Sequence, residues 1–161
     1  MTVIRIVTTI LAPVERCFDL ARDVDFHTRS LADTGERAVA GVTTGLIGLG
    51  ESVTWEARHL GVRQRFTAQV TEFDRPRYFR DVMTAGAFKS FAHDHWFESR
   101  DGGTVMTDEI TFRSPLGVIG ALVDNVFMGG YLRRLLEGRC QAIEREAESR
   151  DHLVAKSRRA E

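Results

Sequence analysis

The sequence predicts an α+β fold in which a seven-stranded, curved antiparallel sheet wraps around one long C-terminal helix. Three observations support this prediction. The chain opens with one strand-like segment and two short helical segments, six further segments alternate apolar and polar residues, and one long apolar stripe of helical period closes the chain. A sheet with a single such helix buries its concave face by curling around that helix, which leaves a cavity between them.

The first element is a strand over residues 2–10, because β-branched residues dominate the segment TVIRIVTTI. Ala12 and Pro13 end this strand, and proline is favoured at the first position of a helix. The amphipathic helix that follows has apolar residues at helical spacing, namely Val14, Cys17, Phe18 and Ala21. A second short helix is expected from Val24 to Leu31.

Six further strands are expected after Gly35, where the apolar period changes to two. Short turn sequences rich in glycine, aspartate and proline separate them, and such short connections join antiparallel neighbours into a meander. The expected strand ranges are 36–42, 51–59, 62–73, 77–84, 88–98 and 104–113.

A long helix is expected to begin at Ser114 and Pro115, which suit the N-cap and the first turn of a helix. Its apolar stripe continues to the neighbourhood of Glu148 and contains a glycine pair, Gly129-Gly130, that favours a bend or a close approach to the backbone. We therefore expect one domain over residues 1–148 and a polar C-terminal tail over residues 149–161.

Composition excludes several classes of protein. The 161 residues include 22 Lys and Arg against 23 Asp and Glu, a formal net charge of −1, whereas a nucleic-acid-binding domain has a basic excess or a basic stripe. Two cysteines, Cys17 and Cys140, cannot build a disulfide scaffold. No signal sequence and no apolar stretch near the roughly 20 residues of a membrane helix is found. We therefore expect a cytoplasmic protein with no nucleic-acid partner and no membrane insertion.

The more apolar face of each strand is assigned to the cavity. Centring one hairpin turn near Gly61 places Trp55 opposite Phe66, an apolar pair. The closing helix contributes Phe127 and Tyr131 to the cavity or its mouth. The inward residues of the last three strands are Phe79, Asp81 and Met83; Phe91, His93, His95 and Phe97; and Met106, Asp108, Ile110 and Phe112.

Two aspartates and two histidines share this otherwise apolar face. The expected register places Asp81 opposite His93 and His95 opposite Asp108, and directly opposed residues have Cβ atoms about 4.5–5.5 Å apart. Three interpretations stay open: the four groups satisfy one another in the core, they orient the polar end of a bound molecule, or they act in catalysis or metal binding. Neither a metal nor another cofactor is expected, because this face offers no third His or Cys and zinc would need both carboxylates.

Several motifs resemble one known superfamily over residues 2 to about 148. They are Ile-x-Ala-Pro-x-Glu-x-x-Phe from Ile10 to Phe18, the stretch from Tyr78 to Met83, His93-x-His95-x-Phe97, and Ser114-Pro115-Leu116-Gly117. They resemble the START-like or SRPBCC superfamily, also called the Bet v 1-like or polyketide cyclase/dehydrase-like group, and a bacterial ligand-binding subfamily within it. The resemblance implies a helix-grip fold whose deep apolar cavity binds a lipid-like, aromatic or polyketide-like molecule.

Two functions from different classes follow. The first is binding of a small hydrophobic molecule whose polar end meets the Asp and His side chains. The alternative is an aromatase/cyclase or dehydrase in which an Asp–His pair is the general acid/base. Trp96 lies on the opposite, outer face of its strand and is a candidate contact in a homodimer.

Overall fold

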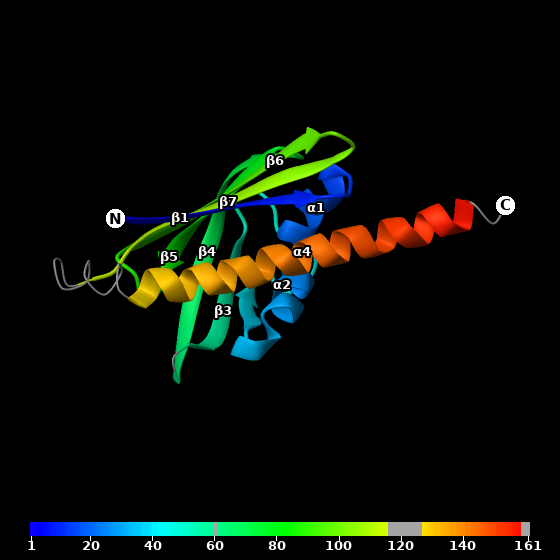
Figure 1. Ribbon diagram of the computed structural model, residues 1–161. Coiled ribbons are helices and arrows are strands. Elements are labelled where there is room, and N and C mark those ends of the chain that lie inside the picture. Colours follow the sequence, from blue (N-terminus) through cyan, green and yellow to red (C-terminus); the bar gives the residue numbers. More distant parts are fainter. Residues whose placement is uncertain (60, 116–126, 159–161) are drawn as a thin grey trace.

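The computed structural model describes residues 1–59, 61–115 and 127–158 of the chain (Figure 1). Every strand boundary lies within two residues of the one expected from the apolar pattern. The elements are β1 (Thr2–Ile10), α1 (Val14–Ala21), α2 (Val24–Ser30), the 3-10 turn η1 (Ala32–Thr34), β2 (Arg37–Gly41), β3 (Ser52–His59), β4 (Val62–Asp74), β5 (Tyr78–Ala85), β6 (Ser90–Arg100), β7 (Gly103–Arg113) and α4 (Gly129–Arg158).

The seven strands form one antiparallel sheet in the order β1-β7-β6-β5-β4-β3-β2. Strands β2 to β7 follow one another as the expected meander, and the expected pairing of Trp55 with Phe66 is confirmed. The first strand closes the sheet on its other side, because β1 pairs with β7 along its whole length. The α+β class with a seven-stranded antiparallel sheet is therefore confirmed.

Irregular pairing between β4 and β5 curves the sheet. The register of these two strands shifts between Thr67 and Ala68 and again between Val70 and Glu72. Such bulges bend the strand that carries them and increase its local twist. Figure 1 shows α4 lying across one face of the sheet and projecting past the strands at its C-terminal end.

The main apolar core lies where α1 and α4 meet the sheet, and Phe18 of α1 is fully buried in it. Its ring makes edge-on contacts with Phe73, Phe79 and Phe97 at centroid distances of 5.3, 5.4 and 5.3 Å. Aromatic pairs of this geometry contribute about 0.5–1.5 kcal/mol each beyond the area that they bury. These rings fill the end of the concave face that α1 covers.

The closing helix is longer than expected at its C-terminal end. Ser114 and Pro115 are not helical, and the expected first turns over residues 116–126 lie outside the described residues. The segment described as α4 starts at Gly129, directly after a π-helical turn at Phe127 and Met128. It ends at Arg158, well beyond Glu148, because Glu, Arg, Lys and Ala in the polar segment are good helix formers. Within the described residues, no helix combines the length and apolar character needed to cross a bilayer.

We expect Phe18→Ala to lower the free energy of unfolding by about 3–5 kcal/mol, because it removes a ring from the centre of the core. Urea denaturation followed by far-UV circular dichroism measures this loss. Val7→Ala is the matched control, since Val7 is 58% exposed, and it should change the free energy by less than about 0.5 kcal/mol. Similar losses in the two variants would contradict the central position of Phe18.

Candidate functional site

A cavity of about 460 Å³ lies between the concave face of the sheet, α2 and α4. Strands β3 to β6 supply mainly aromatic and aliphatic side chains to its wall, and α4 supplies three leucines. A volume of a few hundred cubic ångströms with a mainly apolar wall is typical of small-molecule sites. The larger apolar side chains of the wall are Val24, Leu31, Ile47, Val53, Trp55, Phe66, Val70, Phe79, Phe88, Phe91, Ile110, Met128, Leu132, Leu135 and Leu136.

Most of the residues that the sequence assigns to the site lie in this wall. They are Trp55, Phe66, Phe79, Asp81, Phe91, His93, His95, Ile110 and Tyr131. The alternation of inward and outward residues along the strands brings them together, as the period-two pattern predicts.

Other assigned residues lie elsewhere. Phe97, Met106 and Phe112 point to the same side of the sheet but pack in the main core, because helices and neighbouring rings cover the parts of the inner face that hold them. Met83 lies beside the turn at Gly86, outside the cavity wall. Phe127 is 49% exposed and is likewise not part of the wall.

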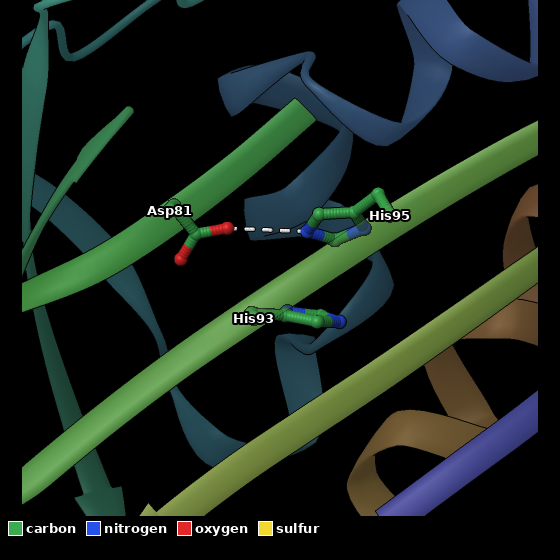
Figure 2. Close-up of side chains that lie close together, drawn as sticks. All are labelled: Asp81, His93 and His95. Carbon is green, nitrogen blue, oxygen red and sulfur yellow. Dashed lines mark hydrogen bonds and ion pairs between the residues drawn. The ribbon is translucent and has the colours of Figure 1, made fainter. Parts of the chain in front are cut away.

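A hydrogen-bonded cluster of four side chains lies at the wall. Asp81, His93 and His95 line the cavity and are drawn in Figure 2, whereas the assigned Asp108 is 2% exposed and is not part of the wall. The strand register is the expected one, with Asp81 opposite His93 and His95 opposite Asp108. The hydrogen bonds run diagonally: His95 Nε2 lies 3.1 Å from Asp81 Oδ2, and His93 Nε2 lies 3.1 Å from Asp108 Oδ1. Asp81 thus bonds His95 and not the expected His93. Side chains lean along their strands, so diagonal neighbours come within reach.

Asp108 joins the cluster to the rest of the fold. Its Oδ1 also lies 2.7 Å from Nδ1 of His95. This contact is an ion pair and not a hydrogen bond, because its angle does not suit one. The Oδ2 of Asp108 accepts a hydrogen bond from Sγ of Cys140 on α4 at 3.5 Å. Burial alone would raise the pKa of Asp108, but the contacts with His93 and His95 outweigh it and hold the pKa well below the usual range for a carboxyl.

The two histidines shift in opposite directions. Burial disfavours the charged form of both rings. Contacts with Asp108 and Asp81 overcome this for His95 and raise its pKa above the ordinary value. Burial and the neighbouring His95 dominate for His93 and lower its pKa to about 4. The cluster therefore favours a protonated His95 between two carboxylates and a neutral His93.

His93 has a second ring nitrogen that the cluster does not use. Its Nε2 contacts Asp108, no hydrogen bond to its Nδ1 is found among the described residues, and the residue belongs to the cavity wall. When Nε2–H donates to the carboxylate, the lone pair of Nδ1 remains available to an occupant of the cavity.

A second polar group in the wall was missed at the sequence level. His27 of α2 stacks on Trp55 at a centroid distance of 4.1 Å, and its Nε2 lies 3.0 Å from Glu36. Arg139 of α4 is 9% exposed, donates to the carbonyl oxygen of Ala21, and has no partner at Nε among the described residues.

The sequence did contain a signal for these residues. Arg139 follows Leu136 by three positions and precedes Ile143 by four, so it lies within the apolar stripe of the helix. His27 follows Val24 by three positions in the same way. A polar residue at an apolar position of a helix therefore indicates a side chain that faces the interior.

Tyr131, which the sequence places at the cavity or its mouth, connects two walls of the cavity. Its hydroxyl lies 2.7 Å from Nδ1 of His59, so α4 is held to the end of β3. Both residues belong to the cavity wall.

Comparisons with known proteins agree with this architecture. A family model described as polyketide cyclase / dehydrase and lipid transport matches residues 1–148. A search of curated proteins gave no significant match.

Three solved structures illustrate the similarity in fold. TTHA0849 from Thermus thermophilus is 22% identical, with 88% of this chain and 97% of that chain covered and a TM-score of 0.68. Ara h 8.0201 is 15% identical, with 92% and 98% covered and a TM-score of 0.66. The major latex-like protein 151 of Panax ginseng is 13% identical, with 91% and 97% covered and a TM-score of 0.68. At these identities the likeness shows the fold alone, and it confirms the START-like, Bet v 1-like arrangement.

The opposite shifts of the two rings lead to a testable pH dependence. Unfolded His93 takes up a proton near pH 6.5, as an ordinary histidine does, whereas the folded ring does so only near pH 4. Between pH 6.5 and pH 4 the unfolded protein therefore binds more protons at His93 than the folded protein does. As a result, His93 makes the free energy of unfolding fall as the pH is lowered from 6.5 to 4. The His93 contribution is at most about 1.4 kcal/mol per pH unit.

Two measurements check this expectation. The imidazole resonances of His93 should stay those of a neutral ring as the pH is lowered from neutral toward 5, while His95 should take up its proton at a higher pH than an ordinary histidine. Urea denaturation of His93→Gln should show a shallower pH dependence than the wild type in the same window. A midpoint for His93 at or above the ordinary histidine value would overturn the assignment.

Proposed function

The chain belongs to the polyketide cyclase/dehydrase and lipid transport family, and on this premise we propose that it binds a small hydrophobic molecule in the cavity between its sheet and α4. The supporting observation is the mainly apolar wall around a volume of about 460 Å³. Apolar area removed from water contributes about 25 cal/mol per Å² to binding before the costs of association. A largely apolar occupant of this volume therefore gains most of its affinity from the wall.

The composition of the wall favours a flat or aromatic occupant. Five aromatic rings from β3 to β6 and the turn before β6 face the cavity, and rings prefer offset or edge-on contacts with other rings. They are Trp55, Phe66, Phe79, Phe88 and Phe91.

The polar cluster specifies one hydrogen bond of the occupant. Nδ1 of the neutral His93 accepts a hydrogen bond, and a hydroxyl group donates one. We therefore expect the occupant to be an apolar molecule with at least one hydroxyl group, placed with that group toward β6. The few placed polar groups of an apolar pocket fix orientation in this way.

A cyclase or dehydrase activity is the second candidate, and one observation favours it. Asp108 holds Nε2 of His93, a residue of the cavity wall, and leaves Nδ1 for a general base toward an enolisable proton of a poly-β-keto substrate. The pKa of about 4 weakens this candidate, because a general base is most effective when its pKa lies near the working pH. Ligand binding is therefore the proposal that we favour.

Two further expectations stay predictions. Trp96 is 37% exposed and stacks on Tyr78 at a centroid distance of 5.6 Å, so part of its ring already has a partner within the chain, and a homodimer contact there awaits a measurement of mass in solution. The cytoplasmic location likewise awaits fractionation of cells that express the protein.

Binding of 2-naphthol tests the proposed function, since it is a flat apolar molecule with one hydroxyl group. We expect saturable binding of one molecule per chain, followed by naphthol fluorescence, with weaker binding of naphthalene because it lacks the hydroxyl group. Ala68→Phe should reduce the affinity at least about tenfold, since the new ring occupies cavity volume. Ala68 is buried in the cavity wall.

Thr71→Phe is the matched control, because Thr71 is an exposed residue of the same strand, and it should leave the affinity unchanged. Circular dichroism confirms that both variants fold. A folded wild type with no saturable binding, or equal affinities in the two variants, would contradict the proposal.

Exchange of α-protons separates the second candidate from the first. A general base at His93 should accelerate the exchange of deuterium into the α-position of a poly-β-ketone, and His93→Gln should abolish that acceleration. Proton NMR measures both rates. Equal rates with wild type and variant exclude His93 as the base and leave ligand binding untouched.

A further inference from the structure

We propose that Asp81, His93 and His95 form a site for one divalent transition-metal ion at the cavity wall, with Asp108 positioning both imidazole rings. This site goes beyond the proposed binding of an apolar molecule and does not depend on it. The donors are two imidazole nitrogens and one carboxylate oxygen.

The donor atoms already lie close together. One atom from each of Asp81, His93 and His95 lies within 4.8 Å of the other two, and Asp81 Oδ2 lies 3.1 Å from His95 Nε2. Ions of this class bond such atoms at about 2.0–2.2 Å, so neighbouring ligands stand about 3–3.5 Å apart. The Asp81–His95 pair has this spacing, and the His93 donor would have to move closer to complete the set, since it lies within 4.8 Å of both. Figure 2 shows the Asp81 carboxylate facing the His95 ring, with the His93 ring alongside.

Asp108 leaves the correct nitrogens free. Its Oδ1 faces Nε2 of His93 and Nδ1 of His95, so Nδ1 of His93 and Nε2 of His95 are the nitrogens left for an ion. Histidines that bind metals commonly donate their other N–H to a carboxylate, which fixes the ring and its tautomer. Here Asp108 bonds the ring of His93 and makes an ion-pair contact with that of His95, and Cys140 donates a hydrogen bond to the same carboxylate.

The charge around the cluster favours a cation. In the metal-free cluster, the carboxylates Glu36, Asp81 and Asp108 face two positive charges among the described residues, the protonated His95 and the buried guanidinium of Arg139, so one negative charge is in excess. Metal ligation requires neutral rings, so a divalent ion would replace the His95 proton and add a second positive charge. A divalent ion balances this excess, whereas an anionic ligand would increase it.

Other charged residues of the wall do not change this balance. Arg22 and Arg65 are paired with carboxylates, since Arg22 lies 2.8 Å from Asp19 and Arg65 lies 3.1 Å from Glu56. Asp23 accepts a hydrogen bond from the backbone of Phe26 as the N-cap of α2.

The donor set and its position indicate the chemical class of the ion. Two imidazoles and one carboxylate suit Fe²⁺, Zn²⁺ and Co²⁺, whereas Mg²⁺ and Ca²⁺ prefer oxygen ligands. Three protein ligands on one side leave open coordination positions toward the cavity. The sequence-level argument against a metal counted both carboxylates as necessary ligands, but the position of Asp108 makes it the residue that orients the rings.

Co²⁺ and Zn²⁺ added to the full-length protein, freed of metal by a chelator, test the site. We expect one Co²⁺ per chain with a visible absorption band of a ligated ion, and displacement of Co²⁺ by Zn²⁺. Asp81→Asn should weaken binding by more than about 100-fold, and Asp108→Asn by about 10–100-fold, as for other residues that support metal ligands. Asp101→Asn is the matched control, because it neutralises an exposed carboxylate at the β6–β7 turn outside the cavity wall, and it should leave the metal affinity unchanged.

Proton NMR of the wild type keeps the proposal testable even where a cluster variant fails to fold. Added Zn²⁺ should shift the imidazole resonances of His93 and His95 and leave those of His27 and His59 in place. A folded wild type that binds no ion at millimolar concentration, or an affinity unchanged in a folded Asp81→Asn variant, overturns the proposal. Zinc-induced shifts that occur only in the imidazole resonances of other histidines also overturn the proposal. Binding of 2-naphthol to the metal-free protein is measured separately, so a failure of one proposal is distinguishable from a failure of the other.

Discussion

The buried carboxylate of Asp108 is the constraint on which the arrangement of the cavity wall depends. A charge at this depth is costly unless donors surround it, and removing one partner of such a group costs about 3–5 kcal/mol. Its partners come from two elements: His93 and His95 from β6, and Cys140 from α4. The need to satisfy one carboxylate therefore constrains the orientation of two rings on β6 and ties the long helix to the sheet.

The division of the concave face into a core and a cavity follows from the short helix α1. Phe18 inserts among Phe73, Phe79 and Phe97 and fills the end of the face that α1 covers. Phe79 also belongs to the cavity wall and stacks on His95 at a centroid distance of 4.0 Å. The packed rings thus support the polar cluster from one side, while the other side of the cluster stays accessible to an occupant.

The strands and most of the cavity wall were predictable from the sequence, because the period-two pattern assigns every second residue to one face and short turns fix hairpin registers. Two features of the fold and the site could not be predicted from the sequence. The pairing of β1 with β7 joins segments that no turn connects, so no local pattern indicates it. The diagonal bond between Asp81 and His95 depends on how the side chains lean, and the register alone names only the directly opposed residue. The core positions of Phe97 and Met106 show a related limit, since which helix covers a given part of the inner face is a matter of tertiary packing.

The environment of His93 connects the proposals. Burial and its neighbour His95 keep the pKa of this ring low, so it is neutral at physiological pH, while Asp108 keeps one nitrogen turned away from the cavity. A ring held in this way is a weak general base, yet its remaining lone pair is well placed to accept a hydroxyl hydrogen bond. A metal ion would use the same lone pair. An occupant that meets the cluster in the metal-bound protein would therefore contact the ion in place of His93, and a neutral or anionic oxygen would replace the hydroxyl donor as the preferred polar end.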